Sequence, residues 1–148
     1  MQDRFKFRVW NKLAKVMTYN VCLGNFELKA GETLSNKIDW IGIDYNEPET
    51  FICFKDTATE YLELMQCTGL KDKNGKLIFE GDLLKANRTY FTSIGEIKFG
   101  LDRNEHLGFF IDWHDKSECI RQDLQYWLPW VEVIGNIYEN PELLELEE

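Results

Sequence analysis

The stretch CTGLKDKNGKLIFEGDLLK at residues 67–85 carries the clearest structural signal in this chain of 148 residues. At its centre lies Asn74-Gly75, a dipeptide that readily adopts the positive φ angles of a type I′ turn between two strands. Apolar segments flank the turn, so Leu70 and Leu77–Phe79 are predicted to be the paired ends of a β-hairpin. The first prediction is therefore a β-rich fold.

Residues 80–82, Glu-Gly-Asp, predict a second turn, and Leu83–Ala86 leaves it as another strand. The carboxylates of Asp72 and Asp82 can accept hydrogen bonds from backbone N–H groups within the two turns. These residue types agree with a structural role for the whole stretch.

Further strands follow at a spacing of roughly ten residues, with glycine at the corners. They are predicted over Gly95–Phe99, Gly108–His114 and Val131–Ile137, and Asn140-Pro141 ends the last of them. This pattern favours a small, strongly curved barrel or sandwich. Glu142–Leu146 can add one helical turn.

The first residues predict a second hairpin. Arg4–Trp10 alternates strictly, which places Phe5, Phe7 and Val9 on one face of a half-buried strand and the basic side chains on the other. After a polar turn, Val16–Val21 repeats the period of two and is predicted to return as the partner strand.

The middle of the chain gives weaker signals. Residues 24–46 are predicted to be loops with one short strand at Trp40–Ile43, and Thr50–Phe54 is a stronger strand prediction. Thr57–Glu60 has the spacing of a capping box, which favours a short helix. That helix competes with a strand through Tyr61–Met65, and the sequence leaves the choice open.

Length and composition predict one folded domain over residues 1–148. A chain of this size buries about two thirds of its unfolded surface, and an apolar fraction of 44% excludes intrinsic disorder. The weak middle divides the domain into two sublobes, an N-terminal β region at 1–56 and a barrel region at 57–148. We therefore predict a mostly β fold with an N-terminal β-hairpin region, a small barrel in the C-terminal half, and at most one or two short helices.

The charge balance limits the classes of partner. With 17 basic and 26 acidic residues the formal charge is -9, which repels phosphate backbones and argues against nucleic acid as a partner. One alternative stays open, a nucleic-acid-related regulator that acts through the basic N-terminal strand or by acidic mimicry of DNA.

Neither a signal-peptide pattern nor an apolar run of about 20 residues occurs, so we expect a cytoplasmic protein without membrane contact. The four cysteines are scattered and form no C-x-x-C pair. They are expected to be reduced, mostly buried thiols.

Three blocks of the sequence resemble the YopX family. They are residues 67–85, Lys6–Asn11 and Val133–Leu144, and they occur in the family's order over nearly the whole chain. The resemblance implies an SH3-like barrel in the C-terminal half, an origin in phages or prophages, and homo-oligomerisation. It implies no biochemical activity and no catalytic residue.

Asp112 and His114 are one pair of candidate site residues. Alternation along Gly108–His114 places them on one face of a strand, where the carboxylate could orient the imidazole as a general base or hold half of a metal site. The sequence nominates no third group nearby, so a surface ion pair is the competing interpretation. We therefore predict no catalytic residue, no metal ligand and no cofactor.

Trp127 and Trp130 are the second candidate pair. They follow the polar stretch 116–125 and form an aromatic cluster with Tyr126 and Pro129. Such residues often anchor interfaces, but they also fill the cores of small barrels. A core role and a peptide-binding or subunit-contact surface both stay open.

The functional prediction is a non-enzymatic accessory protein of phages or prophages. It would act as a self-associating protein-interaction module, with a host or phage protein as a candidate partner. The motifs of phosphate-binding loops, zinc proteases and serine hydrolases do not occur in the sequence. The remaining hypothesis is an uncharacterised enzyme that uses His114 with Asp112.

Overall fold

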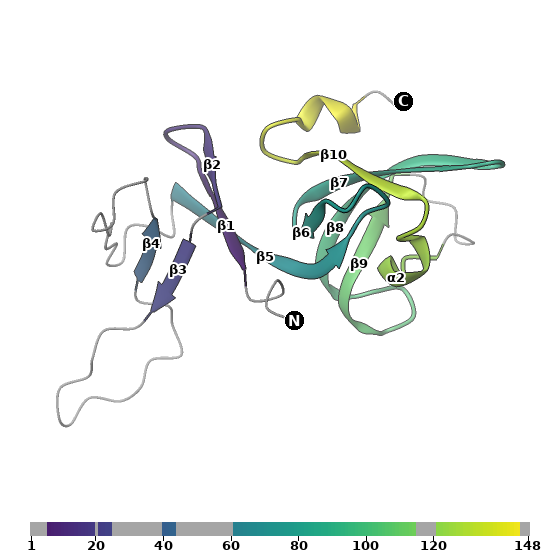
Figure 1. The fold of residues 1–148 in the computed structure, drawn as a ribbon, viewed down its shortest axis with the longest axis horizontal. Coiled ribbons are helices and arrows are strands. Elements are labelled where there is room, and N and C mark those ends of the chain that lie inside the picture. The colour runs from purple at the N-terminus through teal and green to yellow at the C-terminus, as the bar shows by residue number, and fades with distance from the viewer. Residues whose placement is uncertain (1–5, 20, 25–39, 44–60, 115–120, 146–148) are drawn as a thin grey trace. The chain divides into compact units, whose positions relative to one another are not determined.

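The computed structural model describes residues 6–19, 21–24, 40–43, 61–114 and 121–145 (Figure 1). The chain divides into two compact units. The N-terminal unit is Lys6–Met65, and the C-terminal unit comprises Gln66–Glu148 together with Met1–Phe5. The predicted boundary after residue 56, the strand at Thr50–Phe54 and the capping box at Thr57–Glu60 lie outside the described residues.

The N-terminal unit contains the predicted hairpin. Strand β1 (Phe7–Asn11) pairs antiparallel with β2 (Val16–Thr18), and the Asn11 Oδ1 accepts the N–H groups of Leu13 and Ala14 in the turn between them. A second antiparallel pair joins β3 (Val21–Gly24) to β4 (Trp40–Ile43). The strand predicted at Trp40–Ile43 is therefore confirmed, whereas Val16–Val21 is divided between β2 and β3.

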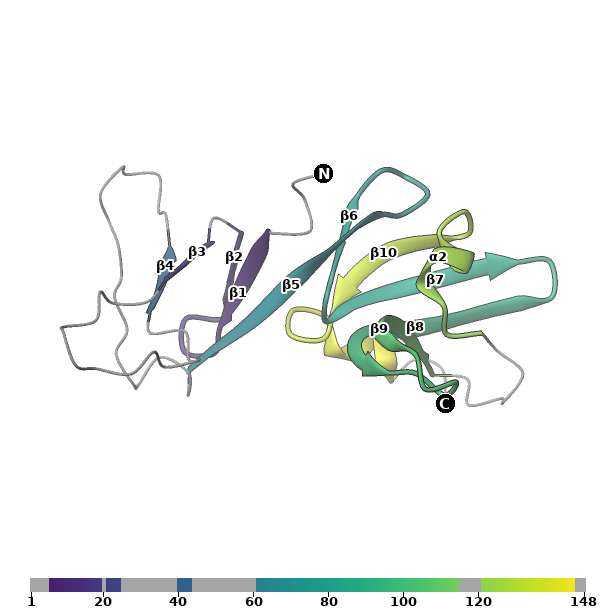
Figure 2. The ribbon, with the colours of Figure 1, turned by 90° about the horizontal axis from the view of Figure 1, so that it is seen from below.

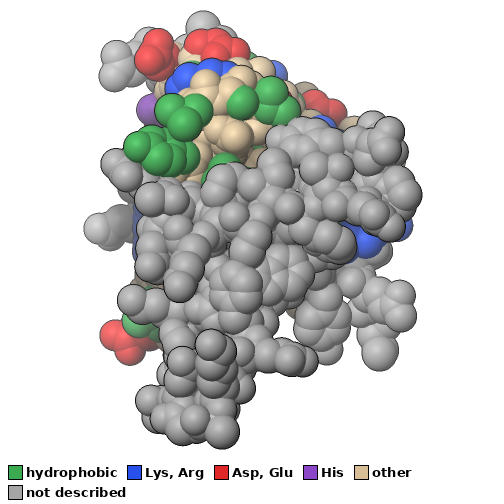
Figure 3. All heavy atoms as spheres, turned by 90° about the vertical axis from the view of Figure 1, so that its left-hand side faces the viewer, with side chains coloured by type: hydrophobic (Ala, Val, Ile, Leu, Met, Phe, Trp, Pro, Cys, Tyr) green, Lys and Arg blue, Asp and Glu red, His purple; other side chains and the backbone are tan. Residues whose placement is uncertain are grey.

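The prediction that β1 has a solvated basic face is wrong at Arg8, which is only 3% exposed. The next two residues, Val9 and Trp10, are also buried. Because consecutive strand residues point to opposite faces, both faces of β1 are covered at this point. Figure 3 shows one side of the molecule, where hydrophobic side chains (green) reach the surface close to lysines and arginines (blue) in the part that is not grey.

The central strand β5 (Leu62–Lys71) contributes to both units, and it confirms the strand alternative for Tyr61–Met65 from Leu62 onward. Its later part forms the predicted hairpin with β6 (Leu77–Phe79), in the register Cys67↔Phe79 and Lys71↔Leu77. The Cys67 thiol is buried and unbridged, as expected for a reduced cysteine.

The turn between β5 and β6 is not of type I′. That type needs positive φ at both central residues, but Gly75 has φ of 83° and Asn74 does not have a positive φ. Instead, the Gly75 N–H donates to the Asp72 carbonyl at 3.0 Å, and the Asp72 Oδ1 accepts the N–H groups of Asn74 and Lys76, each at 2.9 Å. The carboxylate selects a longer loop that still needs glycine at its left-handed position.

The C-terminal unit is built on a four-stranded antiparallel sheet with the order β10-β7-β8-β9. Seen from below in Figure 2, β10, β7 and β8 lie side by side. The sheet strands are β7 (Asp82–Arg88), β8 (Phe91–Leu101), β9 (Leu107–Trp113) and β10 (Val131–Asn136). The short helix α2 (Leu124–Trp127) precedes β10, and the 3-10 helix η2 (Pro141–Leu144) follows it.

The core of this unit confirms the alternation predicted for β9, since Ile111 and Trp113 are 0% and 1% exposed. At the second predicted turn, the Asp82 Oδ2 accepts the Phe79 N–H at 2.8 Å. The buried cluster consists of Ile78, Leu84, Ala86, Ile97, Ile111, Trp113, Leu124, Trp127 and Val131. The fold is mostly β, as predicted, and its curled sheets form half-barrels.

Candidate interaction surface

Four side chains of the C-terminal unit form what we term the aromatic–arginine surface: Arg88, Arg121, Tyr126 and Trp130. Arg88 ends β7, Arg121 precedes α2, Tyr126 lies within α2, and Trp130 follows it. Two arginines and two aromatic rings thus come together from segments that are far apart in the sequence.

Helix α2 is fixed by its N-cap. The Asp123 Oδ1 accepts the backbone N–H groups of Gln125 and Tyr126, at 3.0 and 3.4 Å, which satisfies donors that a helix start leaves open. Trp127 is the inner residue of α2 and is 5% exposed. Its indole N–H and that of Trp113 both donate to the Arg121 carbonyl, at 2.7 and 2.8 Å. Trp127 is therefore a core residue that holds the segment carrying the surface.

Arg88 lies over the aromatic rings. Its guanidinium carbon is 4.2 Å from the centre of the Trp130 ring, and 5.9 and 6.0 Å from the rings of Tyr126 and Trp127. The Nη1 of Arg88 also donates a hydrogen bond of 2.8 Å to the Tyr126 hydroxyl. Cation–π attraction and this hydrogen bond together fix an exposed cation on a preformed platform.

The second arginine contacts the same tyrosine. The guanidinium carbon of Arg121 lies 4.4 Å from the Tyr126 ring centre, and its Nη2 is 3.2 Å from the Asp123 carboxylate. Both side chains of this ion pair are about half exposed, at 60% and 47%. An exposed pair of this kind contributes little to stability, so Arg121 remains able to exchange its carboxylate partner.

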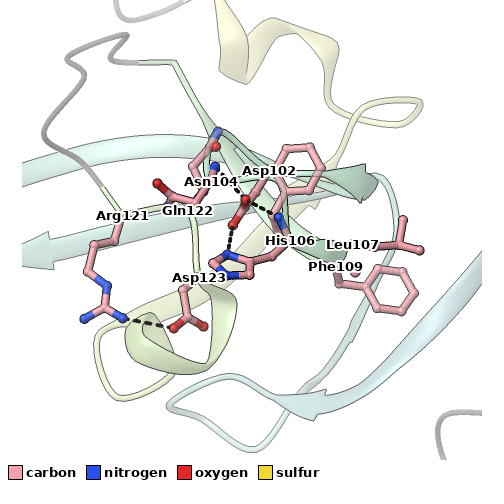
Figure 4. A pocket seen from close by; sticks show the side chains of 10 residues that line it. Asp102, Asn104, His106, Leu107, Phe109, Arg121, Gln122 and Asp123 are labelled. Carbon is pink, nitrogen blue, oxygen red and sulfur yellow. Dashed lines mark hydrogen bonds and ion pairs between the residues drawn. The ribbon is translucent and has the colours of Figure 1, made fainter.

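A pocket of about 340 Å³ lies next to Arg121 (Figure 4). Its polar wall includes Asp102, whose Oδ1 accepts the N–H groups of Asn104 and His106, at 2.8 and 3.0 Å. The Asp102 Oδ2 is 3.5 Å from the His106 Nδ1. The backbone hydrogen bond from His106 is the main reason why the pKa of Asp102 is lowered. These polar groups satisfy one another, and Leu107 and Phe109 supply apolar lining.

The other candidate pair, Asp112 and His114, lies at the end of β9, and each residue has a partner on β8. The Asp112 carboxylate is 2.7 Å from the Lys98 Nζ, and this hydrogen bond is the main cause that raises the pKa of Lys98. The backbone N–H of His114 donates to the Ile94 carbonyl. Among the described side chains, an Asp–His contact joins Asp102 to His106. Their spacing of four residues across a turn is the sequence signal for this contact.

Sequence reasoning found the tryptophans but missed both arginines. Arg88 and Tyr126 are 38 residues apart, and no local pattern joins residues at that separation. The absence of acidic residues from 83–95 was the available signal for Arg88, whereas Arg121 lies two residues before Asp123 and has no such signal.

Two absences hold for the part of the chain that the structure describes. No group of three His, Cys, Asp or Glu side chains is placed to hold a metal ion. No helix in those ranges combines the length and apolarity needed to cross a membrane.

Comparisons with known proteins agree with the fold. A family model described as YopX protein matches residues 6–145. The crystal structure of protein EF1440 from Enterococcus faecalis is similar, with a TM-score of 0.57 and 35% identity over 94% of this chain and 96% of that chain. The crystal structure of yopX from Bacillus subtilis also has a TM-score of 0.57, with 22% identity over 95% of this chain and 98% of that one. No protein with a curated description matches.

Proposed function

The chain belongs to the YopX family, and from this premise we propose that it is a non-enzymatic accessory protein of phages or prophages that self-associates and acts as a protein-interaction module. The observation that carries the proposal is the aromatic–arginine surface. It is a preformed contact surface on a rigid β scaffold, and its residues belong to one compact unit.

The composition of the surface supports a contact role. Trp, Tyr and Arg are the residue types most enriched among those that dominate binding energy at protein interfaces. Trp130 packs edge-on against the buried Trp127, with ring centres 6.3 Å apart. This contact with a core residue fixes the position of the Trp130 ring. Tyr90, two residues beyond Arg88 at the β7–β8 turn, is a further aromatic side chain and is 99% exposed.

The polar geometry also supports the absence of catalysis. In the pocket, the Asp102 carboxylate accepts hydrogen bonds from its own turn, and the His106 side chain is 80% exposed. General acid–base catalysis needs a group held against its substrate, with water excluded from around it. An imidazole in this position lacks that enclosure.

The first test measures self-association of the purified full chain by light scattering coupled to size exclusion. We expect an oligomer at micromolar concentration. We expect Trp130→Ser to raise the dissociation constant of the oligomer by about 10-fold or more. The matched control is Tyr61→Ser, which removes a partly exposed ring from the N-terminal unit and should leave the oligomer unchanged. A wild-type monomer, or a folded Trp130→Ser chain with unchanged mass and unchanged capture of partner proteins, would contradict the proposal.

A further inference from the structure

We propose that Arg88 and Arg121 bind the carboxylates of an acidic polypeptide segment, an inference that rests on the proposed role as a protein-interaction module. The site is the outer side of the aromatic–arginine surface. Its ligand chemistry is that of Asp and Glu side chains on a partner protein.

The donors of Arg88 are the first argument. A guanidinium carries five N–H donors in a fixed fork, and the structure shows one hydrogen bond from this group, to the Tyr126 hydroxyl. Among the described residues, no carboxylate forms an ion pair with Arg88. With respect to those residues, the remaining donors are therefore available to hold a carboxylate by two parallel hydrogen bonds.

Preorganisation is the second argument. Ordering a long, flexible arginine on binding costs conformational entropy. Here the stacking of Arg88 on Trp130 at 4.2 Å and its bond to Tyr126 have already ordered the side chain. Arg121 is placed in the same way on the face of Tyr126, at 4.4 Å. Both cations are thus positioned before a ligand arrives.

Charge complementarity is the third argument. The whole chain has a formal charge of -9, yet the stretches 83–95 and 124–131, which supply Arg88, Tyr126 and Trp130, contain no Asp or Glu. Within the ranges that the structure describes, the one acidic side chain that contacts either arginine is Asp123, through a half-exposed ion pair with Arg121. Because an exposed pair of this kind is weak, an incoming carboxylate can compete for Arg121 at small cost.

The same charges favour an acidic peptide over nucleic acid. A nucleic acid needs a long basic track, because each phosphate contact adds affinity through counterion release. Two arginines on a strongly acidic protein offer a short positive region with repulsion around it. A short segment with a few carboxylates matches this region, whereas an extended phosphate backbone does not.

The test uses the full chain and a short synthetic peptide in which Glu alternates with Gly, labelled for fluorescence anisotropy. We expect saturable binding that weakens with added salt. We expect binding at least about 10-fold weaker for the same peptide with Gln in place of Glu, because the charge-assisted hydrogen bonds are lost. Oligo-dT of equal length and inorganic phosphate are the competing probes, and both should bind more weakly than the Glu peptide.

The informative variant is Arg88→Gln, which removes the cation and should weaken Glu-peptide binding by about 10-fold or more. Its matched control is Arg103→Gln, which changes the net charge equally at an exposed arginine outside the aromatic–arginine surface and should bind within about twofold of wild type. Arg88→Lys should retain part of the affinity, because it keeps the charge but loses the fork.

Four outcomes would overturn the inference: no binding of the Glu peptide, equal binding of the Glu and Gln peptides, tighter binding of oligo-dT, or full affinity in Arg88→Gln. Its failure is separable from that of the proposed function. An oligomer that depends on Trp130 but ignores the Glu peptide rejects the carboxylate site alone, whereas a monomer that binds the peptide rejects self-association alone.

Discussion

Asp72→Ala is expected to lower the free energy of unfolding by about 3 kcal/mol or more, because it leaves three backbone donors without their acceptor. The Asp72 side chain is almost fully buried, in a residue that is 6% exposed. Its Oδ1 accepts the N–H groups of Asn74 and Lys76, and its Oδ2 accepts the Val133 N–H at 2.9 Å. Chemical denaturation monitored by tryptophan fluorescence measures the loss.

The bond to Val133 explains why the effect is large. It links the β5–β6 turn to β10, across a sequence separation of 61 residues. The Lys73 N–H donates to the Val131 carbonyl at 3.1 Å beside it. Removing the carboxylate therefore weakens the turn and frees the outer edge of β10 at the same time.

The stability that Asp72 contributes should depend on pH. Burial by itself raises the pKa of Asp72, but hydrogen bonds from the N–H groups of Val133, Lys76 and Asn74 outweigh it and hold the pKa below 3.8. A folded-state pKa below the unfolded value means that the contribution is fully present above about pH 5 and is lost as the pH falls through the folded pKa. The wild type should therefore lose more stability on acidification than Asp72→Asn does.

The control for both Asp72 variants is Glu142→Gln, which removes one charge at an exposed carboxylate. This change should alter the unfolding free energy by less than about 0.5 kcal/mol. Equal stability of Asp72→Ala and Glu142→Gln, or parallel acid denaturation of wild type and Asp72→Asn, would show that the carboxylate does not join the turn to β10.

Gly95→Ala is expected to destabilise the protein by about 1–3 kcal/mol, and Gly95→Val by more, through overpacking of the core. Gly95 lies in β8 opposite Trp113 of β9. A Cβ at this position would lie 2.8 Å from the Trp113 ring and would overlap the Ile111 side chain. Both neighbours are fully buried, at 1% and 0% exposure, so neither has room to move aside.

A matched control lies on the neighbouring strand. Gly108 in β9 would have nothing within 4 Å of an added Cβ, so Gly108→Ala should change the unfolding free energy by less than about 0.5 kcal/mol. Thermal unfolding of the two variants beside the wild type makes the comparison. Equal stability of Gly95→Ala and Gly108→Ala would mean that the core accepts a methyl group beneath Trp113.

Local chemistry was sufficient for most of the strands. Alternation correctly placed Ile111 and Trp113 in the core of β9, and glycine with polar residues correctly marked the turn between β5 and β6. The type of that turn was missed, because it depends on the Asp72 carboxylate. This carboxylate accepts hydrogen bonds from the Lys76 N–H within the loop and from the Val133 N–H on a distant strand. Arg8 was missed for a similar reason, since periodicity describes one strand and not what covers its second face.

The sequence by itself determined which segments are strands, where most of them turn, and the family to which the chain belongs, because each of these follows from residues close together in the chain. Only the tertiary structure decided that Arg88 lies on Trp130, that Asp72 reaches Val133, and that Gly95 must leave room for an indole. Such contacts form when the β10-β7-β8-β9 sheet is assembled. Their partners are set by packing across the whole unit, which no local period or spacing encodes.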